Sequence, residues 1–132
     1  MSVSQSQPMT QPLAIVCYEV LMPGSQLVNR LQDIGYRVKT LTSAAQLAAE
    51  AAELRPIVIL ADLRSEKNDV CSQITALRKN KETAHIPVLA FADPQASKLQ
   101  QAATVAGATL VANANGVFAQ LPQLLEQILD LQ

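Results

Sequence analysis

Short apolar runs alternate along the chain with longer segments in which apolar residues recur every three or four positions. The clearest run is 56–62, where five consecutive apolar residues, rich in β-branched side chains, end in one acid. Such a run is typical of a parallel strand that is buried on both faces. Further apolar runs predict strands at 13–17, 87–92 and 108–112, and the alternating segment 36–41 predicts an edge strand with one polar face.

The helical spacing predicts one helix after each strand. The first helix should end at Gly35, and Ser43 with Gln46 should form a capping box at the start of the second. Asp93 is predicted to cap the fourth helix, and Pro122 to lie in the first turn of the fifth. The residues expected to face inward from the last three helices are Val70, Ile74, Leu77, Leu99, Ala102, Ala103, Ala106, Leu121, Leu124, Leu125, Ile128 and Leu131.

Five strand–helix units in succession predict an α/β fold with a doubly wound, five-stranded parallel sheet. The expected strand order is 2-1-3-4-5, as in flavodoxin-like domains, with 36–41 at one edge and 108–112 at the other. Residues 1–12 are mostly Ser, Gln, Pro and Thr and predict a flexible tail, so 13–132 is expected to form one domain.

Composition narrows the range of functions. The 132 residues are 49% hydrophobic and 16% charged with a net charge of −1, which is typical of a compact soluble protein without a nucleic-acid surface. The apolar runs are too short to span a bilayer, so no membrane partner is expected. Cys17 and Cys71 come with no signal peptide, which favours reduced thiols in a cytoplasmic protein.

Several motifs suggest a known family. They are Ile57-Val-Ile-Leu-Ala-Asp62-Leu63, Asp69, Ile74-x-x-Leu77-Arg78, His85-Ile-Pro87-Val-Leu89 and Ala106-Gly107-Ala108. In order and spacing, 13–131 resembles the receiver domain of two-component response regulators. The resemblance implies a phosphorelay signalling module whose phospho-acceptor would be Asp62, at the end of the third strand.

The resemblance also implies a Mg²⁺ site that this chain does not reproduce. In receivers, two acids at the end of the first strand hold the ion together with the acceptor aspartate, because Mg²⁺ prefers oxygen ligands. Here these positions are Cys17 and Tyr18, and Glu19 follows one residue late. We therefore expect no cofactor and at most weak Mg²⁺ binding through Asp62 and Glu19.

Other receiver positions are altered in the same way. Receivers carry a hydroxyl residue at the end of the fourth strand, where this chain has Ala92, and a lysine at the end of the fifth, where it has Ala114. The switch aromatic of receivers is replaced by Val111. Without these groups, little offsets the negative charge that develops during phosphoryl transfer. The sequence therefore predicts a degenerate receiver that is not an enzyme.

Three functions remain open at this point. The first is a stand-alone pseudo-receiver that acts by protein–protein interaction, with a signalling protein or histidine kinase as partner and a possible homodimer through 95–131. The second is a divergent receiver that a histidine kinase or phosphotransfer protein still phosphorylates on Asp62. The third is a small-ligand-binding flavodoxin-like domain, for which no phosphate-binding glycine loop is present.

Tyr18 and the two cysteines also have alternative interpretations, and His85 has one. Tyr18 is expected to be an exposed aromatic that either covers the altered metal site or contacts a partner. Cys17 and Cys71 are either a redox pair or small buried hydrophobic residues. His85 is expected to be a loop residue, since no Asp or Ser accompanies it.

Overall fold

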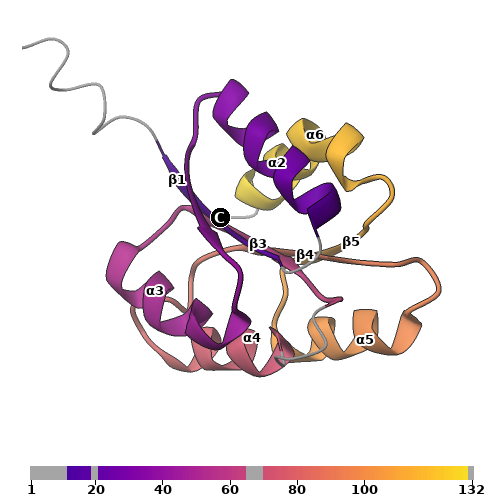
Figure 1. Ribbon diagram of the computed structural model, residues 1–132. Coiled ribbons are helices and arrows are strands. Elements are labelled where there is room, and N and C mark those ends of the chain that lie inside the picture. Colours follow the sequence, from indigo (N-terminus) through magenta and orange to yellow (C-terminus); the bar gives the residue numbers. More distant parts are fainter. Residues whose placement is uncertain (1–11, 19–20, 65–69, 131–132) are drawn as a thin grey trace, which may run out of the picture.

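The computed structural model describes residues 12–18, 21–64 and 70–130. These residues form a five-stranded sheet, all of whose neighbouring strands are parallel, in the order β2-β1-β3-β4-β5 (Figure 1). The predicted fold class and strand order are thus confirmed. The strands are β1 (Leu13–Cys17), β2 (Arg37–Leu41), β3 (Val58–Asp62), β4 (Val88–Ala92) and β5 (Leu110–Asn113).

Helices cover both faces of the sheet. Figure 1 shows α3, α4 and α5 on one face and α2 with α6 on the other. Right-handed crossovers between neighbouring parallel strands produce such a two-sided arrangement. The helices are α2 (Leu21–Asp33), α3 (Leu47–Leu54), α4 (Val70–Lys79), α5 (Ser97–Ala106) and α6 (Val117–Asp130), with a 3₁₀ turn at Ala44–Gln46.

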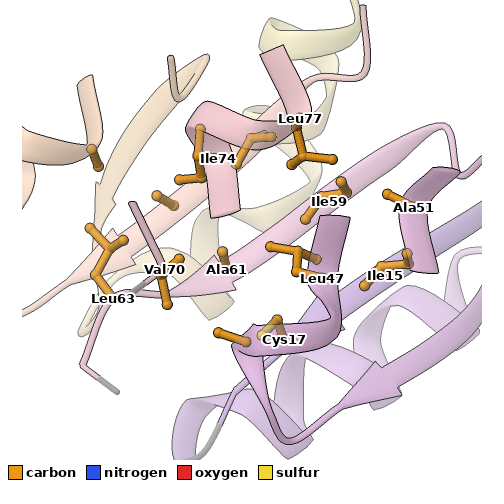
Figure 2. Packing of buried hydrophobic residues seen from close by; sticks show 14 of the residues in the cluster. Ile15, Cys17, Leu47, Ala51, Ile59, Ala61, Leu63, Val70, Ile74 and Leu77 are labelled. Atoms are coloured by element: carbon orange, nitrogen blue, oxygen red, sulfur yellow. The ribbon is translucent and has the colours of Figure 1, made fainter. Parts of the chain in front are cut away.

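The core consists of two apolar layers, one on each face of the sheet. Within β1, Ile15 and Cys17 belong to the layer beneath α3 and α4, whereas Ala14 and Val16 belong to the layer beneath α2 and α6. Successive side chains of a strand point to opposite faces, so a strand with helices on both sides must be apolar throughout. Figure 2 shows part of the first layer.

The helix α2 ends just before Gly35, as predicted, and α5 ends just before Gly107. Gly35 and Gly107 have φ angles of 102° and 119°, in the left-handed region that favours glycine. The backbone N–H of Tyr36 then donates to the carbonyl of Leu31, which closes the last turn of α2.

Two predicted helix starts are wrong. The Ser43 side chain makes no capping bond, because a 3₁₀ turn separates it from α3. Asp93 does not cap α5, which begins four residues later at Ser97; the Asp93 carbonyl instead accepts the N–H of Ala96 in a preceding turn. Sequence signatures of caps do not register extra turns placed ahead of a helix.

Two details of the last helices also differ from prediction. Pro122 lies inside α6 and not in its first turn, because the helix begins at Val117. On α5, Ala103 is buried as predicted, but Leu99 is 40% exposed. The helix contacts the sheet through a narrower stripe than the apolar pattern indicates.

The predicted tail lies outside the described residues except for Pro12, whose carbonyl accepts the N–H of Arg37. Within 12–18, 21–64 and 70–130, no helix has the length and apolarity needed to cross a membrane.

Candidate functional site

The candidate site lies where the carboxyl ends of the parallel strands meet. Asp62 ends β3 and is paired with Phe91 of β4, and Ala92 is paired with Asn113 of β5. Cys17 ends β1 beside Ala61. In open α/β sheets this edge is the usual place for ligands and chemistry.

Asp62 is almost completely buried, with 1% of its surface exposed. Its carboxylate is held by Arg64, two residues further along the chain. Oδ1 accepts the backbone N–H of Arg64 and its Nε–H, both at 2.9 Å, and Oδ2 accepts from Nη2 at 2.8 Å. The pair is a bidentate ion pair, the strongest common geometry between a carboxylate and a guanidinium.

The charge balance of this pair follows from its burial. A buried carboxylate is costly unless it is paired, and the Arg64 side chain is itself only 20% exposed. The pKa of Arg64 is raised chiefly by its hydrogen bonds to Asp62; burial opposes the rise, and the charges of Asp62 and Asp93 add to it. Arg64 therefore remains a cation at all physiological pH values.

Cys17 and Tyr18 lie in opposite apolar layers of the core. Cys17 is buried in the layer beneath α3 and α4, and Figure 2 labels it among the apolar side chains there. Tyr18 packs on the opposite layer, where its ring contacts Gly24 of α2. The prediction that Tyr18 is an exposed aromatic is wrong, because the ring is half-buried against α2.

The remaining receiver positions carry no reactive group. Ala92 and Ala114 are buried, and the backbone N–H of Ala114 donates to the carbonyl of Ala92. Next to them, the Asn113 side chain accepts the N–H of Asn115 at 2.8 Å and so forms a local turn. Val111 is half-buried in β5 and provides no aromatic ring.

The Mg²⁺ that the resemblance implies does not fit the described residues. Both carboxylate oxygens of Asp62 accept hydrogen bonds from a cation, and Cys17 and Tyr18 carry no carboxylate that could complete a metal site. Glu19 lies outside the described residues. Among 12–18, 21–64 and 70–130, His, Cys, Asp and Glu side chains nowhere gather in groups of three that could hold a metal ion.

The other predicted candidates are the two cysteines and His85. Cys17 and Cys71 are thiols and not a disulfide, and Cys71 packs at the border of the same apolar layer as Cys17. His85 is exposed in the turn before β4. Arg64 is not among the residues that the sequence motifs indicate for the site.

The chain was compared with known proteins. No protein-family model matches it, and no curated protein matches it significantly. Many solved structures do match. The chemotaxis protein CheY4 of Vibrio cholerae superposes with a TM-score of 0.80 at 19% identity, covering 90% of this chain and 99% of that one.

Two further structures give the same result. A LuxR-family response regulator from Aurantimonas matches with a TM-score of 0.78 at 19% identity over 92% of this chain and 86% of its own. The receiver domain of sensor histidine kinase PA1611 from Pseudomonas aeruginosa, which has a magnesium ion coordinated in its active-site cleft, matches with a TM-score of 0.82 at 18% identity over 92% and 99%. This chain has the receiver fold.

Proposed function

We propose that this chain is a receiver-like signalling domain that acts by protein–protein interaction and is not switched by phosphorylation of Asp62. The observation that carries this proposal is the Asp62 carboxylate, whose two oxygens are engaged by Arg64. Phosphoryl transfer needs a nucleophilic oxygen and preorganised groups that stabilise the transition state. In this proposal the domain is not an enzyme.

The missing switch parts support the same proposal. A ligand shifts a conformational equilibrium only by its different affinity for two states. Ala92 has no hydroxyl that a phosphoryl group would draw toward it, and Val111 has no ring that would turn inward behind it. A phosphoryl group on Asp62 would therefore lack both an anchor and a moving part.

The proposed partner is another signalling protein or a histidine kinase, bound on the face formed by α5, β5 and α6. A groove between α5 and β5 supports this assignment; it is lined by Ser97, Gln100, Gln101, Thr104, Val105 and Val111. Val105 is 87% exposed, which is unusual for a large apolar side chain. The same face, within 95–131, is the proposed contact of a homodimer.

Phosphorylation and its structural response test the proposal directly. The chain is incubated with Mg²⁺ and acetyl phosphate, and the mass of the intact protein is measured by mass spectrometry. Amide NMR spectra are recorded with and without fluoroberyllate, a mimic of the phosphoryl group. We expect no added phosphoryl mass and no shifts spreading from Ala92 to Val111. A receiver of proven activity, treated in parallel, is the positive control.

The runner-up function is a divergent phospho-acceptor. It is favoured by the placement of Asp62 at the end of β3 within the receiver fold. A phosphoryl adduct that disappears in Asp62→Asn, or large fluoroberyllate shifts in α5 and β5, would establish the runner-up in place of the pseudo-receiver.

A further inference from the structure

We infer that Arg64 is a built-in counter-ion that has replaced the divalent cation of this site, and that it closes the Asp62 carboxylate to metal ions. The inference rests on the proposed function, since both concern Asp62. It adds a reason why Asp62 would bind no metal ion: a contact within the chain occupies its carboxylate, in addition to the loss of the other metal ligands.

The geometry of the pair supports this role. An ionised carboxylate has about four lone-pair positions for hydrogen bonds. Arg64 occupies three of them, with two donors on Oδ1 and one on Oδ2. A divalent cation binds the same lone pairs, so it would have to displace the guanidinium.

The pair is also held in place by its backbone. Asp62 is the last residue of a central strand, and the N–H of Leu63 donates to the carbonyl of Phe91 at 2.9 Å, which continues the pairing with β4. Arg64 is joined to the carboxylate by its own backbone N–H as well as by its side chain. Because the two residues are only two positions apart, closing the contact orders little additional chain.

Burial makes the pair mutually dependent. Removing one partner of a buried ion pair leaves an uncompensated charge, whereas removing both can be nearly neutral. Arg55 and Glu82 provide a matched control, since their N–O distance is also 2.8 Å but their side chains are 67% and 56% exposed. An exposed pair of this kind contributes little to stability.

The first test is a double-mutant cycle measured by urea unfolding, with Arg64→Met, Asp62→Asn and the double variant. We expect each single change to raise the unfolding equilibrium constant by at least about tenfold, and the double variant to be more stable than either single one. The corresponding Arg55→Met and Glu82→Gln cycle should be additive within about twofold. Additive effects at Asp62 and Arg64 would overturn the inference, and recovery of the fold in the double variant supports it even if one single variant fails to fold.

The second test uses Mn²⁺ as a paramagnetic probe of the carboxylate. We expect about 1 mM Mn²⁺, a concentration that occupies weak oxygen sites, to leave the amide signals of Ala61 and Leu63 unchanged in the natural chain. The same concentration should broaden them in Arg64→Met and not in the double variant with Asp62→Asn. Broadening in the natural chain, or none in a folded Arg64→Met, would overturn the inference.

The two proposals fail in different ways. A phosphoryl adduct on the natural chain would refute the proposed function, whatever the Mn²⁺ result. An additive cycle, or an Arg64→Met variant that takes no Mn²⁺, would refute the role of Arg64 and leave the pseudo-receiver standing.

Discussion

The Tyr18 ring lies so close to Gly24 that residue 24 has no room for a side chain. A Cβ at Gly24 would collide with the Tyr18 ring atoms Cγ and Cδ2. We expect Gly24→Ala to lower the free energy of unfolding by about 1–3 kcal/mol through overpacking, although alanine favours helices.

Urea unfolding of two further variants separates this contact from a backbone effect. In a Tyr18→Ala background, Gly24→Ala should become neutral or stabilising. Gly116→Ala is the matched control, because the nearest atom to a Cβ there is 3.9 Å away. A similar loss at Gly24 with or without the Tyr18 ring would contradict the overpacking explanation.

Arg78 joins three segments near the amino end of β4. Its Nε donates to the carbonyl of Gly107 at 2.9 Å, and its Nη1 donates to the carbonyls of Ala84 and Ile86 at 2.9 and 2.8 Å. Burial lowers the pKa of Arg78, because desolvation penalises the charged form of the guanidinium. The side chain therefore acts as a structural cross-link and not as a partner-binding charge.

We expect Arg78→Met to reduce the free energy of unfolding by about 2–4 kcal/mol, because it leaves carbonyls that accepted charge-assisted bonds without a donor. Thermal or urea unfolding measures the loss. The exposed Arg55→Met is the control and should cost no more than about 0.5 kcal/mol. Equal losses at the two positions would show that the cross-link contributes nothing specific.

The Asp62–Arg64 pair shows the limit of prediction at the residue scale. The acid at the end of a buried strand was evident from the sequence, because apolar runs and their ends are local patterns. The sequence did contain one indication that Arg64 could reach Asp62, since residues two positions apart share a face of an extended strand. Whether the chain keeps that direction after Asp62 depends on packing around the next loop, which the sequence pattern does not describe.

Among the elements, the end of α3 has an unusual backbone conformation. Arg55 follows the helix as its C-cap with a φ of 51°. Among the described residues, Arg55 is the only non-glycine residue with a positive φ. A residue with a Cβ costs roughly 1 kcal/mol in this conformation. We expect Arg55→Gly to stabilise the chain by about that amount.

Arg55→Gly also removes the ion pair with Glu82, and this loss has to be separated from the effect on the backbone. Arg55→Gly is therefore best measured by chemical unfolding in a Glu82→Gln background, where the small contribution of the exposed pair is absent. Leu54→Gly, one position earlier and still helical, is the control and should destabilise by about 1 kcal/mol. A loss of stability in Arg55→Gly would contradict the strain argument.

Element types and order could be predicted, whereas element starts could not. The strands β3 and β4 can be recognised in the sequence because both faces of a central strand must be apolar. Ser43 and Asp93 carry capping signatures, yet a 3₁₀ turn and a short turn stand between them and their helices. Such turns are set by how far each helix must shift to reach the sheet, which is a tertiary property.

At the scale of the whole molecule, the fold was the most predictable property and the function of the site the least. Five strand–helix units leave few permitted topologies, so strand order follows from general rules of connection. The candidate site instead depends on which way individual side chains turn at the sheet edge. Cys17 and Tyr18 are neighbours in sequence, but they point into opposite apolar layers.

The final prediction concerns assembly through α5, β5 and α6. Val105 is the most exposed large apolar side chain among the described residues, and a symmetric dimer on this face would bury it twice. Burying one such side chain contributes roughly 1.5 kcal/mol, so two contribute about 3 kcal/mol, which corresponds to about 100-fold in the dimer dissociation constant. We expect Val105→Glu to weaken self-association by at least this factor in sedimentation equilibrium. Leu54→Glu, on α3 and 37% exposed, is the matched control and should leave association unchanged; equal effects of the two variants would place the contact elsewhere.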